Sequence, residues 1–173
     1  MFWLTAYTGA RAGEMTQLRG MDVEARGKTY VVKLTPEAGT IKTGTARVVP
    51  LHAHLIEQGF IEFVKSHGKG PLFYNAAEKS AVEDALNPKA DRASKARQRL
   101  GSWVRKLGVD DPELSPTHAW RHTFKARAER AGISERLSDY ITGHAPATEG
   151  RKYGAPTAED MARAMENFPR YEV

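Results

Sequence analysis

The sequence predicts an α+β fold: a mostly helical domain that carries a small three-stranded antiparallel sheet. Two observations support this prediction. Apolar residues recur at helical spacing over most of the chain, for example at Leu55, Ile61 and Val64. Between residues 21 and 52, short β-branched segments alternate with glycine-containing turns. A chain of 173 residues can form one domain with a real core and is short for two, so we expect a single domain over residues 1–173.

The expected strands are short and contain valine pairs. Pro50 has no backbone N–H, which places the last strand at a sheet edge or ends it there. We predict the three strands over residues 21–23, 30–34 and 47–51.

Periodicity and capping residues predict the helices. Ser115 followed by Pro116 is a strong helix start, Ser134 caps the next helix, and Gly143 ends it. We expect helices over residues 2–7, 11–18, 52–67, 90–107, 115–130 and 134–143, and a last one that Pro156 and Thr157 open. In the 90–107 helix the residues expected to face inward are Leu100, Trp103, Val104 and Leu107.

Composition narrows the classes of function. The net charge of +5 and the pI near 9.5 favour a polyanionic partner, although the basic run between residues 89 and 106 also fits a solvated helix face. The absence of cysteine excludes disulfides, thiolate zinc sites and thiol catalysis. It fits a cytoplasmic location, which we expect. The sequence contains no apolar run of ~18 residues, so we expect no membrane partner.

Arginine, histidine and tyrosine residues form a candidate catalytic set. Arg11 lies near the start, His118 and Arg121 lie one helical turn apart, and His144 precedes Tyr153 by nine residues. Taken singly, each has a structural explanation, such as a surface ion pair, a helix cap or a packed aromatic ring. Together, two arginines, two histidines and a tyrosine can attack a phosphodiester without a metal ion.

The order of these groups resembles the tyrosine recombinase (phage integrase) family. The matching segments are Thr8-Gly-Ala-Arg-Ala-Gly-Glu14, Lys42 followed by Arg47-Val-Val-Pro-Leu51, His118-Ala-Trp-Arg-His-Thr123, and Gly143-His144 with Tyr153. The resemblance covers nearly the whole chain. Ala10 and Trp120 stand where the family usually has leucine, and the segment before Tyr153 lacks the common Ser/Thr-rich composition.

The resemblance implies a mechanism that uses neither a metal ion nor a cofactor. Tyr153 would attack the scissile phosphate and form a 3′-phosphotyrosyl link. Arg11 and Arg121 would stabilise the charge of the transition state. The covalent link would retain the phosphodiester energy, so the strands could be rejoined without ATP.

Three further roles follow from the resemblance. Lys42, on a glycine-containing turn, would be the general acid that protonates the leaving 5′-oxygen. His118 would take or return the tyrosine proton, and His144 would hydrogen-bond to the phosphate.

The resemblance also implies partners. The chain would bind double-stranded DNA attachment sites, with possible accessory DNA-bending proteins. It would form a homotetramer on DNA and be a monomer as a free fragment. Family members usually carry an N-terminal helical core-binding domain, and we expect this chain to be a catalytic domain without it.

Three alternatives remain open from the sequence. A metallohydrolase could use His118, His122 and His144 as ligands, although Arg121 between the first two would repel a cation. A non-catalytic DNA-binding relative could keep the fold. Type IB topoisomerase-like strand relaxation would use the same chemistry as recombination.

Overall fold

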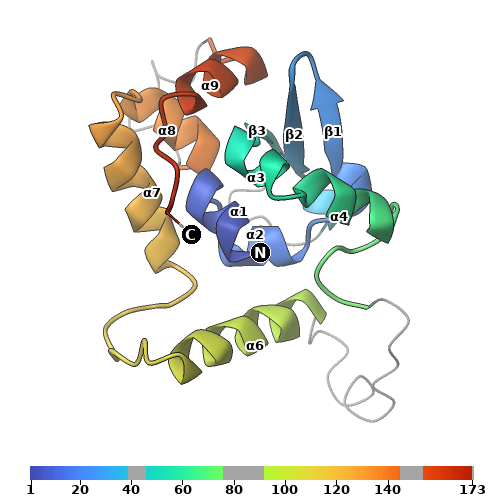
Figure 1. Cartoon of the computed structure of the whole chain (residues 1–173), viewed down its shortest axis with the longest axis vertical. Coiled ribbons are helices and arrows are strands. Elements are labelled where there is room, and N and C mark those ends of the chain that lie inside the picture. The colour runs from blue at the N-terminus through green and yellow to red at the C-terminus, as the bar shows by residue number, and fades with distance from the viewer. Residues whose placement is uncertain (39–45, 76–91, 145–153, 173) are drawn as a thin grey trace.

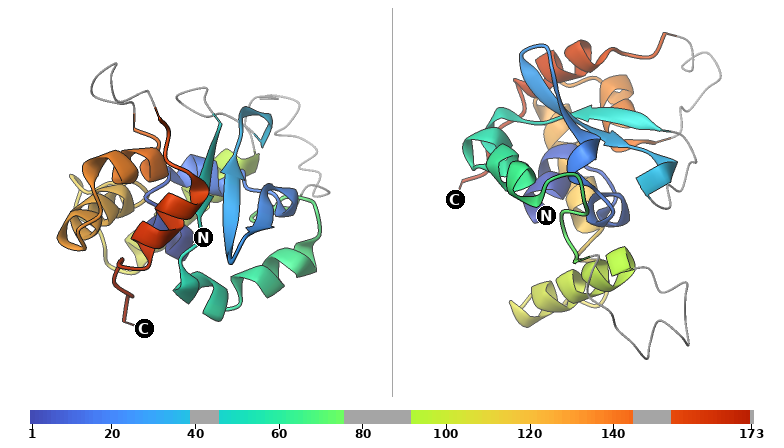
Figure 2. Two further views of the ribbon diagram at one scale, coloured as in Figure 1. Left: turned by 90° about the horizontal axis from the view of Figure 1, so that it is seen from above. Right: turned by 90° about the vertical axis from the view of Figure 1, so that its right-hand side faces the viewer.

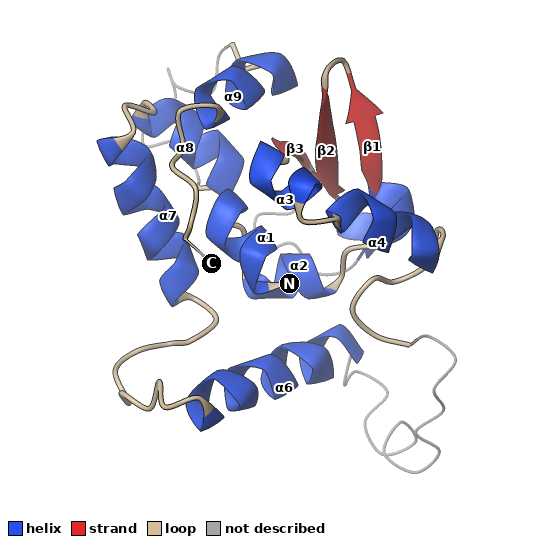
Figure 3. Cartoon of the chain, viewed as in Figure 1, coloured by secondary structure: helices blue, strands red, loops and turns tan. Residues whose placement is uncertain are grey.

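The computed structural model describes residues 1–38, 46–75, 92–144 and 154–172. Helices pack against a three-stranded antiparallel sheet that lies toward one side of the molecule (Figures 1 and 3). The predicted fold class, mostly helical with a small antiparallel sheet, is confirmed.

The sheet has the order β1-β2-β3 with antiparallel neighbours. Its strands are β1 (Val23–Arg26), β2 (Thr29–Leu34) and β3 (Arg47–Pro50). The edge position predicted for the last strand from its proline is therefore confirmed. The prediction that the first strand spans residues 21–23 is wrong. A 3-10 turn over Gly20–Asp22 occupies that segment, because the Asp22 carboxylate accepts a hydrogen bond from the Arg19 backbone N–H at 3.0 Å.

The chain begins with two helices that meet at a sharp break. Helix α1 (Phe2–Thr8) ends at Gly9, whose φ of 57° is left-handed. Helix α2 (Ala12–Thr16) follows with Arg11 as its N-cap residue and is shorter than predicted. The break itself was predicted correctly, and it brings Arg11 close to the end of α1.

The amphipathic segment 52–67 is two helices rather than one. Gly59 has a φ of 82° and separates α3 (Ala53–Glu57) from α4 (Phe60–His67). The prediction of one continuous helix is wrong because hydrophobic periodicity continues across a single left-handed residue without a visible change.

Helix α6 (Arg92–Lys106) lies at one end of the molecule (Figures 1 and 2), where it contacts α2 and where Trp103 stacks on Phe2 with ring centroids 5.6 Å apart. The prediction that its apolar residues face inward is wrong for Trp103, which is 51% exposed, and for Leu107, which is 61% exposed, whereas Leu100 and Val104 are half-buried. Of the residues that α6 contributes, only Ala93 is buried. Periodicity shows which residues share a face, but it does not show whether that face has a partner.

Three helices complete the domain: α7 (Ala119–Arg130), α8 (Glu135–Thr142) and α9 (Ala158–Met165). The prediction that the first of them begins at Ser115 is wrong. Residues 115–118 form a turn in which the His118 N–H donates to the Ser115 carbonyl at 3.0 Å, so His118 is the N-cap residue of α7. The predicted Ser134 cap and Gly143 stop of α8 are confirmed.

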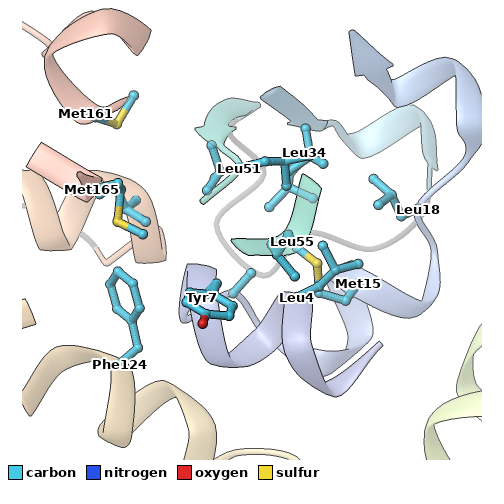
Figure 4. Close-up of a cluster of buried hydrophobic side chains, with 14 of the residues drawn as sticks. Leu4, Tyr7, Met15, Leu18, Leu34, Leu51, Leu55, Phe124, Met161 and Met165 are labelled. Carbon is cyan, nitrogen blue, oxygen red and sulfur yellow. The ribbon is translucent and has the colours of Figure 1, made fainter. Parts of the chain in front are cut away.

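One apolar core connects the sheet with the helices around it (Figure 4). Tyr7 of α1 and Phe124 of α7 are fully buried, and Met161 and Met165 of α9 pack against the same cluster. The core therefore fixes α1, α7 and α8, the elements that carry the candidate site.

In the described ranges, no helix is long and apolar enough to cross a membrane.

Gly9 provides a test of this packing. A Cβ at Gly9 would lie 2.7 Å from both the Phe124 ring and the Thr142 methyl group. We expect Gly9→Ala to lower the free energy of unfolding by about 2–5 kcal/mol, from left-handed strain of about 1–2 kcal/mol and overpacking of about 1–3 kcal/mol. Urea denaturation measures this change.

The matched control is Gly27→Ala in the β1–β2 turn. Gly27 has a φ of 58°, yet a Cβ there meets nothing within 4 Å. We expect it to cost about 1–2 kcal/mol, from backbone strain alone. Equal losses at the two positions would show that Gly9 is not tightly packed.

Candidate active site

Arg121 lies at the centre of the candidate site and is only 3% exposed. Its Nη1 donates to the Gly9 carbonyl at 2.8 Å and to the Thr142 carbonyl at 2.5 Å. Its Nε donates to His144 Nε2 at 3.4 Å. Its Nη2 is buried and has no hydrogen-bond partner among the described residues. One donor of a buried guanidinium is therefore left for another acceptor.

Helix ends explain why these two carbonyls accept from Arg121. Gly9 caps the C-terminus of α1, and Thr142 is the last residue of α8. Carbonyls in the last turn of a helix lack intrahelical partners and lie at the negative end of the helix dipole. Two helix C-termini therefore converge on one cation, whose pKa burial and the nearby Arg11 charge lower to about 10. Arg121 stays charged at neutral pH.

Glu14 provides one of the buried negative charges of the site. It accepts two hydrogen bonds from Arg47, at 3.0 and 2.7 Å, and one from the Arg11 backbone N–H at 2.8 Å. Burial alone would raise the pKa of Glu14, but the hydrogen bonds and charge of Arg47, with those of Arg11, hold this pKa below its usual value. The carboxylate stays ionised and fixes both arginines.

The Arg11 side chain is held less tightly than that of Arg47. Its Nη1 lies 3.3 Å from Glu14 Oε1, and 25% of the side chain is exposed. The i,i+3 ion pair that the sequence offered as a structural explanation does form, but Arg47 is the stronger partner of Glu14. Arg11 can therefore turn toward another anion without leaving Glu14 unpaired.

His144 follows the end of α8 and contacts groups from two helices. Its Nδ1 lies 3.0 Å from Thr142 Oγ1 and 3.6 Å from Asp139 Oδ1. Lys125 Nζ donates to the same Asp139 oxygen at 2.8 Å. Partial burial and the charges of Arg121 and Lys125 lower the pKa of His144 to about 4, although Asp139 acts in the opposite direction. The imidazole is therefore neutral at neutral pH.

His118 lies at the N-cap of α7, one turn before Arg121. Its ring is exposed and meets the His122 ring edge-on, with centroids 5.0 Å apart. Within the described ranges, no group of three or more His, Asp or Glu side chains could hold a metal ion. The three-ligand cluster that the metallohydrolase alternative requires does not form.

The structure thus brings Arg11, Arg121 and His144 together, with His118 at the start of the same helix as Arg121. The other two predicted site residues, Lys42 and Tyr153, lie outside the described residues.

Sequence reasoning missed three residues of this network: Arg47, Thr142 and Asp139. Arg47 opens a strand, and nothing in the sequence connects it with Glu14, 33 positions earlier. Thr142 and Asp139 lie in an amphipathic helix, and only the Ile-Thr-Gly-His order hinted that Thr142 could reach His144.

Comparison with known proteins agrees with the family resemblance of the sequence motifs. The sequence profile of the phage integrase family matches residues 1–160. No curated protein sequence matches the chain. Among solved structures, the integrase from mycobacterium phage Brujita is similar, with a TM-score of 0.60 and 19% identity over 99% of this chain and 52% of that one.

XerH site-specific recombinase is also similar, in pre-cleavage and post-cleavage complexes with its difH substrate. The TM-scores are 0.53 and 0.52, with 21% identity over 84% of this chain and 38% of each XerH chain. At these identities the likeness shows the fold. The chain spans about half or less of the length of each of these proteins.

The lowered pKa of His144 predicts a stability change in acid. The pKa falls from 6.5 to about 4 on folding, so between these pH values the unfolded chain binds more protons at this residue. Stability is then lost as the pH falls through this window. We expect urea denaturation to show a smaller loss for His144→Gln than for the wild type between pH 6.5 and 4. Identical pH dependence of the two proteins would contradict the lowered pKa.

Proposed function

Because the chain belongs to the phage integrase family, we propose that it acts in site-specific DNA recombination by breaking and rejoining DNA strands. The observation that carries the proposal is the buried Arg121 guanidinium, whose Nη2 lacks a partner among the described residues. Arg11 and His144 lie beside it. A fork-shaped cation with an unused donor matches a phosphate oxygen.

The local charge supports binding of an anion. Arg11, Arg47 and Arg121 lie around the buried carboxylate of Glu14, while the second buried carboxylate, that of Asp139, is paired with Lys125. The surplus positive charge would be neutralised by a phosphodiester and, more strongly, by the extra charge of its pentacoordinate transition state. Removing one such preorganised donor costs roughly 10²–10³-fold in rate.

The reacting groups of the proposal come from the family resemblance. Tyr153 is the nucleophile that forms the 3′-phosphotyrosine intermediate, Lys42 is the general acid, and His118 handles the tyrosine proton. A free phenol has a pKa of about 10 and is a poor nucleophile at neutral pH. Nearby arginine charges and a base would lower this barrier, so the proposal needs no metal ion.

The proposed substrate is double-stranded DNA carrying an attachment site. The basic face of α6, with Lys95, Arg99 and Lys106 around an open hollow beside the exposed Trp103, supports binding of a polyanion. Assembly as a homotetramer on DNA, and the help of accessory bending proteins, belong to the same proposal. Strand relaxation of the type IB kind would use the same site, and formation of Holliday junctions from two duplexes separates the two reactions.

Covalent trapping tests the nucleophile. The full chain is incubated in EDTA with a pool of nicked duplexes of randomised sequence. Cleavage close to the nick releases a short oligonucleotide that diffuses away, so the strand cannot be rejoined and the protein–DNA adduct persists. We expect a protein–DNA adduct on the 3′-phosphate with the wild type and none with Tyr153→Phe, because only the tyrosine hydroxyl can form the link.

Tyr30→Phe is the matched control, since Tyr30 lies in β2 and has no proposed role. It should form adduct as the wild type does. Failure of the wild type to form any adduct would favour a non-catalytic DNA-binding protein. Loss of the adduct in both variants would point to a folding defect.

The role of Lys42 can be tested by changing the leaving group. General acid catalysis contributes about 10²–10⁴-fold, so Lys42→Ala should slow adduct formation by that factor. A thiol has a pKa of about 8.5 and leaves without protonation. We therefore expect a substrate with sulfur at the bridging 5′ position to restore the rate of Lys42→Ala, and Lys28→Ala to react normally with both substrates. A lasting defect on the sulfur substrate would assign Lys42 a different role.

A further inference from the structure

The hydrogen bonds of His144 determine which of its ring nitrogens carries the proton. The Thr142 hydroxyl donates its single proton to the Ser138 carbonyl at 2.7 Å. Toward His144, Thr142 Oγ1 can then only accept, so Nδ1, at 3.0 Å, must be the donor. The other nitrogen, Nε2, keeps its lone pair and accepts from Arg121 Nε at 3.4 Å.

This tautomer conflicts with a simple phosphate contact. The resemblance gives His144 a hydrogen bond to the phosphate, whose oxygens are acceptors. An Nε2 without a proton cannot donate to them. His144 can make this contact through Nε2 only if that nitrogen first gains a proton, which turns the ring into an imidazolium. The Arg121 Nε–H that donates to Nε2 at 3.4 Å must then change its acceptor, and the oxyanion would supply the new one.

The surroundings oppose this protonation until an anion arrives. From α7, the positive charges of Arg121 and Lys125 face the ring, and Arg11 adds a third from the start of α2. Among the described residues, Asp139 of α8 is the negative group whose charge acts on the ring. Its Oδ1 is 3.6 Å from Nδ1 and is already bound by Lys125. An oxyanion on the Nε2 side would supply the missing negative charge.

The His144 ring is only partly covered. The His144 side chain is 39% exposed, whereas the Arg121 guanidinium beside it is buried with Nη2 unpaired. An oxyanion that reaches Nη2 would thus approach His144 as well. Thr142 and Asp139 lie on the opposite, Nδ1 edge, where they can hold a protonated ring in place.

We propose that binding of an oxyanion beside Arg121 takes up one proton from solvent onto Nε2 of His144. Thr142 and Asp139 are positioning residues in this step: the hydroxyl keeps Nδ1 as a donor, and the carboxylate balances the imidazolium charge. The inference rests on the proposed function, because the same site would hold the scissile phosphate. Recombination would then depend on pH through His144 as well as through the nucleophile.

The probe is sulfate, a tetrahedral oxyanion that does not titrate between pH 5 and 7, added to the full chain. The ¹⁵N shifts of the His144 ring report its tautomer and protonation. Without sulfate we expect Nδ1–H and a lone pair on Nε2. Saturating sulfate should move the protonation of His144 upward by at least one pH unit. In return, sulfate affinity should rise about tenfold for each unit by which the pH falls, because binding of one sulfate takes up one proton.

Variants of Thr142 separate positioning from packing. Thr142→Val removes the acceptor of Nδ1–H at 3.0 Å, so we expect the share of the Nε2–H tautomer in the neutral ring to rise and sulfate binding to lose part of its pH dependence. Thr142→Ser retains the hydroxyl and should behave as the wild type. Thr16→Val is the matched control: Thr16 is also buried, and its hydroxyl donates to a carbonyl one turn earlier, that of Gly13. It should leave the His144 signals unchanged.

Asp139→Asn tests the counter-charge. We expect the protonation of His144 in saturating sulfate to move back to lower pH while the Nδ1–H tautomer persists. A wild-type ring with its proton on Nε2 would overturn the inference. So would sulfate binding that leaves the His144 titration unchanged, or no sulfate binding at this site.

These results are independent of the adduct assay. Adduct formation through Tyr153 without proton uptake would refute this inference and leave the proposed function standing. Proton-linked sulfate binding without any adduct would establish the oxyanion site and refute strand cleavage by this chain.

Discussion

The site depends on the buried ion pair between Glu14 and Arg47. Arg47 opens strand β3, and besides Glu14 it donates to the Ile141 and Thr142 carbonyls at 3.4 and 3.3 Å. One guanidinium therefore connects α2, the sheet and the C-terminus of α8. Removing one member of a buried pair typically costs about 3–5 kcal/mol, because the other charge is left uncompensated. Here such a loss would also release the end of α8, which holds Arg121 and His144.

Two glycines allow these charged groups to approach the backbone so closely. Gly143 ends α8 in a left-handed conformation, and a Cβ there would lie 2.6 Å from Arg47 Cζ. Gly9 does the same for α1 beside Phe124. The helix stops are thus also the places where guanidinium groups reach free carbonyls. The glycines that end α1 and α8 therefore also create the space and the free carbonyls that the arginines of the site need.

The sequence predicted what local chemistry determines. Caps and glycine stops located α1, α8 and α9, and the motif order selected Arg11, Arg121 and His144. The errors concern contacts between distant segments. Periodicity could not show that part of the apolar stripe of α6 stays exposed or that Gly59 divides a helix. Arg11 looked like the partner of Glu14 because it lies three residues away, whereas Arg47 approaches through tertiary structure. Only the fold places that second arginine.

The uneven charge balance has a physical consequence. Three arginines and Lys125 meet two buried carboxylates, those of Glu14 and Asp139, and two helix C-termini stabilise Arg121 further. Carbonyl dipoles stabilise a cation without cancelling its charge. A further carboxylate beside Arg121 would stabilise the free protein more, but it would also occupy the donor that Arg121 keeps unpaired. The arrangement therefore retains a positive potential, which makes an oxyanion the natural completion of the site.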